Sequence, residues 1–309
     1  MVYQNVLEAL GNTPLIKLSR LVPVGSAQVL VKFEAINIGG SIKTRTAHNM
    51  IQDAEEKGIL TPDSIIVEPT SGNQGIGLAL VGAVKGYKVR IIMPDSVSAE
   101  RRKLIHAYGA ELVLVHDEGD IGACIQKCMD TANRMAAEDP RVWVPQQFDN
   151  PSNPAVHKNQ TALEILDQVE GDIHGYCSGF GTGGTLSGIG AILKDRFPHI
   201  QIWAAEPENA AVLSGGRVGS HVQMGIGDGL IPGNLDTDLV DNISIVTDEE
   251  AIATAQRLMR EEGLLCGISS GSNVAVALRL AEKLGEGKTV VTILPDTGER
   301  YFSTTLFDF

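Results

Sequence analysis

The chain has 309 residues, 43% of them hydrophobic and 20% charged, which is enough to form two domains of ordinary size. Its formal net charge of −13 argues against nucleic acid or an anionic membrane surface as a partner. Because no stretch predicts a membrane span and the N-terminus lacks the pattern of a secretory signal, we expect a cytoplasmic protein.

Strand-like and helix-like segments alternate along most of the chain. The segments that favour strands are "SIIVEPT" (64–70), "KVRIIMP" (88–94), "AELVLVH" (110–116), "IHGYCSGF" (173–180), "IQIWAAEP" (200–207) and "TVVTILPD" (289–296). Helical segments follow most of them. This order predicts an α/β fold with mostly parallel sheets, and the continuous hydrophobic runs predict sheets covered on both faces. A loop rich in Pro and Asn, "FDNPSNPAVH" (148–157), marks a plausible domain boundary.

Cysteine and metal-ligand patterns predict no metal site. Cys124, Cys128, Cys177 and Cys266 are scattered, and no second pair completes a zinc pattern with Cys124 and Cys128. We therefore expect reduced, buried thiols and no metal.

Three loops combine glycine with Ser, Thr or Asn and lie between a strand and a helix. They are "PTSGNQG" (69–75), "GTGGT" (181–185) and "GISSGSN" (267–273). Glycine lets backbone N–H groups approach a ligand, and the helix that follows adds its positive end, so each loop can bind an anion. Each alone equally fits a tight helix entry. No loop has the spacing of a dinucleotide-binding or Walker sequence.

Lys43 of "NIGGSIKTR" (37–45) begins a helical segment, directly after a Gly-Gly-Ser turn. The positive end of a helix disfavours a charged lysine, and burial adds to the effect. A neutral lysine can form a Schiff base with an aldehyde cofactor, although an ordinary exposed lysine fits the segment as well. Together with a phosphate-binding loop and a hydroxyl-rich loop for a carboxylate, Lys43 predicts a pyridoxal 5'-phosphate site that acts on an amino acid.

From "GNTPLIKL" (11–18) to "GERYFSTTLF" (298–307), the sequence resembles the O-acetylserine sulfhydrylase (cysteine synthase) and cystathionine β-synthase family, within fold type II of the pyridoxal phosphate enzymes. The resemblance implies two three-layer αβα domains with the cofactor in the cleft between them. It implies a smaller, mobile domain of residues 1–12 and 37–148 and a larger domain of residues 13–36 and 149–309. It also implies a homodimer, whereas no feature of the sequence supports serine acetyltransferase as a partner.

The same resemblance assigns roles to individual residues. Lys43 links to the cofactor and acts as base at Cα, Asn73 contacts the cofactor's 3-oxygen, and Ser269 meets the pyridine nitrogen. The remaining assignments are Gly181, Thr182, Gly183, Gly184 and Thr185 for the phosphate, and Thr70, Ser71, Asn73, Gln74 and Gln147 for the substrate. Because a serine hydroxyl stabilises a pyridinium less than a carboxylate does, β-replacement through an α-aminoacrylate is favoured over transamination.

Asp228 of "GIGDGL" (225–230) departs from the family, which commonly has Ala, Pro or Tyr there. A carboxylate beside the incoming nucleophile would repel hydrosulfide, but it can take a proton from water or an amine. An Asp that faces outward from a glycine turn explains the residue equally well. Gln74, where the family usually has Thr, and Asn273, where small apolar residues are usual, are further departures.

These observations predict a transferase or lyase of cysteine metabolism and amino-acid biosynthesis. Cysteine synthesis from O-acetylserine and sulfide is the family's default reaction. Conversion of cysteine and water to serine and hydrogen sulfide, with Asp228 as base, is the first alternative. A dehydratase-like relative and a non-catalytic binder with the same fold are the others, and the intact Lys43 argues against the binder.

Overall fold

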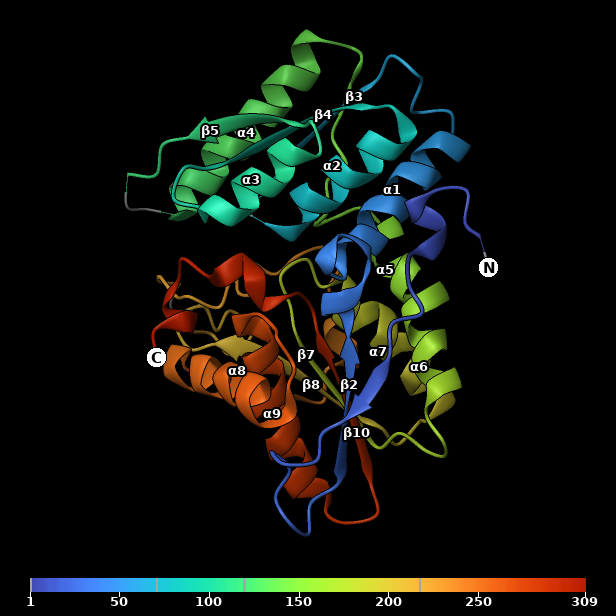
Figure 1. Cartoon of the computed structure of the whole chain (residues 1–309), viewed down its shortest axis with the longest axis vertical. Helices are drawn as coiled ribbons and strands as arrows, with labels where there is room; N and C mark the ends of the chain where they lie inside the picture. Colours follow the sequence, from blue (N-terminus) through green and yellow to red (C-terminus); the bar gives the residue numbers. More distant parts are fainter. Residues whose placement is uncertain (1, 71, 119–120, 217) are drawn as a thin grey trace.

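Two mainly parallel β-sheets lie between layers of helices in the structure, a computed structural model that describes residues 2–70, 72–118, 121–216 and 218–309 (Figure 1). Within these ranges, the larger sheet has the strand order β1-β2-β10-β7-β8-β9 and the smaller β5-β4-β3-β6. The strands are β1 (Leu15–Lys17), β2 (Gln28–Phe33), β3 (Ile65–Pro69), β4 (Lys88–Pro94), β5 (Glu111–Val115), β6 (Val142–Trp143), β7 (Gly175–Gly179), β8 (Gln201–Pro207), β9 (Asn242–Val246) and β10 (Thr289–Leu294). Among the strands named here, only β1 pairs antiparallel with its neighbour, which confirms the predicted fold class.

Helices separate the strands in chain order. The α-helices are α1 (Lys43–Glu56), α2 (Asn73–Lys85), α3 (Ala99–Ala107), α4 (Ile121–Glu138), α5 (Ser152–Val156), α6 (Ala162–Gln168), α7 (Gly184–Arg196), α8 (Asp248–Glu262) and α9 (Ile268–Leu284). A single π-helical turn, η4 (His157–Thr161), joins α5 to α6. Short 3-10 turns are η1 (Val6–Ala9), η2 (Glu34–Ile36), η3 (Ile38–Gly40), η5 (Thr237–Leu239), η6 (Gly298–Tyr301) and η7 (Thr305–Phe307). Within the described ranges, every helix is too short or too polar to cross a lipid bilayer.

Both faces of the smaller sheet are covered, as its hydrophobic strands predict. Neighbouring residues of one strand point to opposite faces. Ile66 and Ile91 accordingly pack in the core formed with α1, α2 and α3, whereas Val67 and Ile92 pack against Cys128 of α4. The sheet is therefore buried on both sides, and its edge of strand carboxyl ends is left for ligands.

The larger sheet is covered in the same way. On one face, Val29 and Val290 pack in a core with residues of α8 and α9. On the other, Val291 and Ile202 pack with residues of α6 and α7. Three of its strands, β1, β2 and β9, were not predicted from the sequence: β1 has three residues, β2 is followed by 3-10 turns and not by a long helix, and β9 has only five residues.

The chain crosses between the sheets twice. It contributes β1 and β2 to the larger sheet, builds the smaller one with β3 to β6, and returns with β7 to β10 (Figure 1). The expected division into two domains, with its boundaries, stays a prediction.

A buried ion-pair network holds α1 to β2 and α6. Arg45 Nη2 lies 2.9 Å from Glu34 Oε1, and Arg45 Nη1 lies 2.6 Å from Glu164 Oε1. Lys32 Nζ completes the network at 2.7 Å from Glu164 Oε2. The side chains of Lys32, Glu34 and Arg45 are fully buried. Although burial opposes its charge, the two glutamates raise the pKa of Arg45 above its usual value.

Candidate active site

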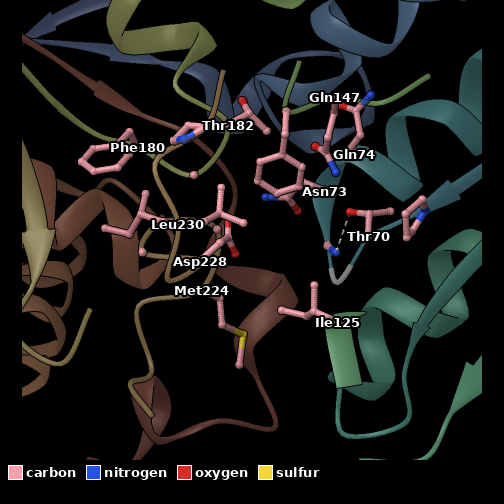
Figure 2. A pocket seen from close by; sticks show the side chains of 18 of the residues that line it. Thr70, Asn73, Gln74, Ile125, Gln147, Phe180, Thr182, Met224, Asp228 and Leu230 are labelled. Carbon is pink, nitrogen blue, oxygen red and sulfur yellow. Dashed lines mark hydrogen bonds between the residues drawn. The ribbon is translucent and has the colours of Figure 1, made fainter. Parts of the chain in front are cut away.

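A cavity of about 610 Å³ lies between the two sheets (Figure 2). Its lining includes the residues at the carboxyl ends of β3 and β7 and at the amino ends of α1, α2, α7 and α9. Ligands of parallel α/β sheets bind at this edge, and helix amino ends carry partial positive charge. Four such helix ends meet here, so the cavity favours an anionic ligand despite the acidic chain.

Lys43 is the first residue of α1 and faces the cavity. Backbone pairing of Ile42 N with Pro295 O, at 2.9 Å, fixes the start of this helix against the end of β10. Burial lowers the pKa of the Lys43 amine, while the carboxylate of Asp228 acts in the opposite direction. The lowered pKa suits this amine to act as a nucleophile or base.

The turn between β7 and α7 contains the predicted phosphate-binding glycines. Gly183 has a φ of 78°, in the region that favours glycine, and caps α7, which begins at Gly184. A Cβ added to Gly184 would lie 2.1 Å from Asn153 Oδ1, and one added to Gly183 would lie 2.7 Å from Leu235 N. Residues 183 and 184 therefore cannot carry a side chain. The N–H groups of the first turn of α7, which have no partner within the helix, are left for a ligand.

Two threonine hydroxyls flank this turn. Thr182 is 4% exposed, and its Oγ1 accepts a hydrogen bond of 2.9 Å from Asn153 Nδ2. Thr185 lines the cavity, and its Oγ1 lies 3.3 Å from His157 Nε2. Neither Asn153 nor His157 belongs to a predicted site motif, and both lie in the segment interpreted as a domain boundary.

Ser269 lies in the first turn of α9, is 3% exposed and lines the cavity. The segment 267–273 was expected to be a loop, but α9 begins at Ile268. Likewise α2 begins at Asn73, inside the loop expected at 69–75. In both cases helical hydrogen bonding starts within the motif because small residues such as Gly and Ser do not prevent it, so the ligand-facing residues sit on rigid helix ends.

The predicted substrate-binding residues Thr70, Asn73, Gln74 and Gln147 line the opposite wall of the cavity, whereas Ser71 lies outside the described residues (Figure 2). Thr70 Oγ1 accepts a hydrogen bond of 3.3 Å from Gly72 N. Gln74 is 1% exposed, and neither its Oε1 nor its Nε2 has a partner within the described chain. An unsatisfied buried amide costs about 1–3 kcal/mol, so Gln74 is prepared for a polar ligand group.

Asn73 is held by the C-terminal segment. Its Nδ2 donates to Asp296 Oδ2 at 2.7 Å, and its Oδ1 accepts from Arg300 Nη1. Tyr301 Oη donates to the same carboxylate oxygen at 2.8 Å. The amide is thereby fixed in one orientation, and no sequence motif pointed to these partners.

Gln147 is fixed through its backbone at both ends. Its N–H donates to Glu68 Oε1 at 3.1 Å, and its carbonyl accepts from Asn153 Nδ2 at 2.7 Å and Asn234 Nδ2 at 2.9 Å. Glu68 also accepts from Gln146 N, where φ is 56°. Burial raises the pKa of Glu68 to about 8, although the two N–H donors act against this shift. This carboxyl group therefore shapes the loop that presents Gln147, and no motif pointed to it.

Asp228 points into the cavity (Figure 2). Gly225, Gly227 and Gly229 all have positive φ, so the loop turns at every second residue and directs Asp228 inward. A Cβ on Gly181 would lie 2.9 Å from Asp228 Oδ2, so this carboxylate lies close to the turn between β7 and α7. Burial raises the pKa of Asp228, while Lys43 and His221 lower it. The outward-facing alternative is thus wrong for this structure.

The residues present fit pyridoxal 5'-phosphate. A lysine with a depressed pKa, a glycine turn at the start of α7, and a hydroxyl in the first turn of α9 line one cavity. The unpartnered amide of Gln74 is left for a second polar group. These four groups can bind, in the same order, the aldehyde, the phosphate and the ring nitrogen of the cofactor and the carboxylate of an amino acid.

Comparisons with known proteins agree with this donor set. Residues 6–296 match the family described as "Pyridoxal-phosphate dependent enzyme". A cysteine synthase of Staphylococcus aureus (strain N315) is 48% identical over 306 residues, which cover 99% of this chain and 97% of the relative.

Two solved structures are similar over nearly the whole chain. O-ureido-L-serine synthase superposes with a TM-score of 0.93 and 41% identity, covering 100% of this chain and 96% of the other. A hydrogen sulfide-producing enzyme from Fusobacterium nucleatum superposes with a TM-score of 0.92 and 36% identity, covering 97% of this chain and 100% of the other.

Proposed function

Because this chain belongs to the family of pyridoxal-phosphate dependent enzymes, we propose that it catalyses β-replacement on a small amino acid. The main reaction proposed is the synthesis of cysteine from O-acetylserine and hydrosulfide, in which acetate leaves Cβ and the sulfur takes its place. The observation that carries the proposal is the convergence of the Lys43 amine, the Gly181–Thr185 turn and Ser269 on one cavity. The full-length similarity to cysteine synthase supports the choice of substrates.

Pyridoxal phosphate, when bound, supplies an electron-withdrawing ring that stabilises negative charge at the substrate's Cα. Lys43 would hold its aldehyde carbon, the N–H groups of the Gly181–Thr185 turn its phosphate, Ser269 its ring nitrogen and Asn73 its 3-oxygen. Lys43 then accepts the proton from Cα, because burial has lowered the pKa of its amine.

The substrate carboxylate would be bound by Thr70, Gln74 and Gln147. The Gln74 amide has no partner among the described residues and gains one when a carboxylate is present. The Gln147 side chain is presented by a backbone held through both its N–H and its carbonyl. Both amides are thus positioned before the substrate arrives, which reduces the entropy that binding costs.

A second candidate reaction, conversion of cysteine and water to serine and hydrogen sulfide, is favoured by the position of Asp228. Its carboxylate shares the cavity with Lys43, and burial raises its pKa. In this reaction Asp228 takes a proton from water as the oxygen bonds to Cβ, while the sulfur that leaves Cβ departs as hydrogen sulfide. The similarity to a hydrogen sulfide-producing enzyme supports it.

One experiment tests both reactions. Purified protein loaded with pyridoxal phosphate is given either O-acetylserine with sulfide or cysteine alone, and cysteine, serine and sulfide are measured by mass spectrometry and a sulfide assay. Cysteine from the first mixture alone supports the main proposal, and serine with sulfide from the second supports the alternative. Neither product from either mixture would refute β-replacement.

The variant Asp228→Asn tests whether Asp228 acts as the base that activates water. If Asp228 activates water, the variant loses serine formation at least tenfold while the absorbance of the bound cofactor is unchanged. The exposed Asp195→Asn on α7 is the matched control and should behave as the wild type. Serine formation at the wild-type rate in Asp228→Asn would exclude this role.

We propose further that the chain acts as a cytoplasmic homodimer whose smaller domain, residues 1–12 and 37–148, closes onto the larger, residues 13–36 and 149–309. The family resemblance supports the dimer, and four buried free cysteines support a reducing compartment. Light scattering should give twice the chain mass of 32.9 kDa, and small-angle scattering should report a smaller radius of gyration when a substrate analogue is added. A mass of one chain, or an unchanged radius, would contradict the respective proposal.

A further inference from the structure

Arg101 is a buried, positively charged side chain at the cavity, and none of the roles assigned above involves it. It lies on α3, is 2% exposed and lines the cavity. Charged side chains are rarely buried without a partner of opposite charge, because removing a charge from water is costly. The contacts of Arg101 therefore decide whether its charge is already compensated within the described chain.

Neutral groups surround one side of the guanidinium. Its Nη1 donates to Ser98 Oγ at 3.1 Å and to Met224 Sδ at 3.0 Å. The guanidinium also lies over the Tyr301 ring, 4.7 Å from the ring centroid. None of the ion pairs among the described residues involves Arg101. These contacts therefore hold the guanidinium in place without neutralising it.

A second buried arginine, Arg300, lies close by with one buried carboxylate, Asp296. Burial lowers the pKa of Arg300, Asp296 raises it, and the positive charge of Arg101 lowers it again. The Asp296 carboxylate already accepts hydrogen bonds from Asn73 and Tyr301. This cluster thus contains two positive charges and one negative charge, so one positive charge is left over at this wall of the cavity.

The free edge of the guanidinium faces Gly72. Both hydrogen bonds of Arg101 use Nη1, and its Nε is buried without a partner within the described residues. A Cβ added to Gly72 would lie 3.7 Å from this Nε, and no other described atom outside the neighbouring residues would lie within 4 Å of it. The chain therefore leaves a space the size of a methyl group beside an unused N–H donor. Both Gly72 and Arg101 line the cavity.

The space suits a small, singly charged anion. Arginine binds anions through paired N–H donors on one edge, and such charged hydrogen bonds are roughly twice as strong as neutral ones. Hydrosulfide is about as large as a methyl group, and its soft sulfur is compatible with the thioether of Met224 nearby. Met224, Thr70 and Asn73 border the same open space (Figure 2). Because Gly72 lies between Thr70 and Asn73 in the chain, an anion here would lie next to the bound amino acid.

We propose that Arg101 and Gly72 form a binding subsite for the anionic nucleophile, hydrosulfide. This inference rests on the proposed synthesis of cysteine and names the residues that bind its second substrate. The chain has a net charge of −13, and the Asp228 carboxylate in the cavity also repels an anion. Hydrosulfide therefore needs a local positive charge to enter, and Arg101 supplies it. In return, the bound anion compensates a buried charge that is otherwise unpaired.

Kinetics of the holoenzyme test the role of this charge. The variants are Arg101→Gln, Arg101→Lys and the matched control Lys103→Gln, which removes an exposed positive charge from the same helix. Arg101→Gln should raise the KM for sulfide about tenfold or more, because a charged hydrogen bond is lost, while the KM for O-acetylserine should change far less. Arg101→Lys keeps the charge without the paired donors and should raise the KM for sulfide by a smaller factor. Lys103→Gln should match the wild type.

Salt separates an effect of charge from an effect on structure. In the wild type, kcat/KM for sulfide should fall as sodium chloride is added, because chloride screens Arg101 and competes for the subsite. Arg101→Gln should lose this dependence, whereas Arg101→Lys should keep it. Equal increases in both KM values, an increase confined to O-acetylserine, or wild-type salt dependence in Arg101→Gln would overturn the inference. If Arg101→Gln does not fold, a wild-type KM for sulfide in Arg101→Lys would overturn it as well.

Anion binding is also measured without catalysis. Crystals of the wild-type holoenzyme are soaked in sodium bromide, and the anomalous signal of bromine locates the bound anions. We expect bromide beside Arg101 Nε and Gly72, and none there in Arg101→Gln. An empty subsite in the wild type would contradict the inference. Wild-type protein that forms no cysteine but binds bromide at this position would instead refute the proposed synthesis and leave the anion subsite standing, so the two failures are distinguishable.

Discussion

Replacing Glu34 by Gln should destabilise the protein strongly, because Glu34 is a fully buried partner of Arg45. In the wild type, its two oxygens accept hydrogen bonds from Arg45 Nε and Nη2, from Thr13 Oγ1 at 2.6 Å and from Asn37 Nδ2 at 2.7 Å. Glutamine keeps the shape, but it removes the charge and turns an N–H₂ group toward these donors. The network of Lys32, Arg45 and two glutamates then carries one uncompensated positive charge.

The magnitude follows from the burial of both partners. Removing one partner of a buried ion pair costs about 3–5 kcal/mol, because the other charge stays desolvated and unpaired. Glu164 still faces Arg45 from the other side, at 2.6 Å, so we place the loss near the lower end, at about 3 kcal/mol. The exposed pair of Arg257 and Glu261 should be worth only about 0.3–0.5 kcal/mol.

The assay is urea unfolding followed by circular dichroism, for Glu34→Gln and for the control Glu261→Gln. Without a change in the slope, the difference in midpoint gives the difference in unfolding free energy. High salt should leave the loss in Glu34→Gln nearly unchanged, because the pair is buried and poorly screened. A loss below about 1 kcal/mol in Glu34→Gln, or equal losses in both variants, would refute the reasoning about burial.

Two further predictions concern packing and pH. In Gly271→Ala, the new Cβ would lie 1.9 Å from Ala251 O of α8, so α8 and α9 must separate, and the variant should lose about 3 kcal/mol of unfolding free energy and melt at a lower temperature. In the control Gly219→Ala, the nearest atom lies 3.7 Å away, so its melting temperature should stay unchanged. Equal melting temperatures of the two variants would contradict this packing. Because the pKa of Glu68 is about 8 in the folded state against 4.5 as its ordinary value, the unfolded state loses this proton first as the pH rises. Between pH 4.5 and 8, the unfolding free energy of the wild type should therefore fall by up to about 5 kcal/mol relative to that of Glu68→Gln. If urea unfolding gave the same dependence of unfolding free energy on pH for both proteins, the carboxyl group would titrate normally.

The sequence was sufficient for the features that depend on local pattern. Alternating strands and helices predicted parallel sheets, and the glycine turn at 181–185 lies at the end of β7 as expected. Lys43 begins α1, as expected. These predictions succeeded because periodicity and glycine content reflect backbone geometry directly. For Asp228 the sequence left both orientations open, and only the structure places it at the cavity.

Long-range partners could not be predicted in this way. Glu68 and His157 belong to no motif, and their contacts form only when segments far apart in the sequence meet. Asn273 is a similar case: its Oδ1 accepts from Gly179 N at 2.6 Å and its Nδ2 donates to Ile293 O at 2.8 Å. It thus bridges β7 and β10 where they diverge beside the cavity, which explains a polar residue at a position where small apolar residues are usual.

The two crossings of the chain between the sheets also impose an order of assembly. The smaller sheet uses only strands between residues 65 and 143, so its contacts are complete when less than half of the chain has been synthesised. In contrast, β2 pairs in parallel with β10, and Gln28 meets Thr289 in that register. One edge of β2 can pair early with β1, but its other edge stays open until β10 has been synthesised. Such distant pairing is slow and exposes a strand edge, so β2 is a segment of the nascent protein that needs protection from aggregation.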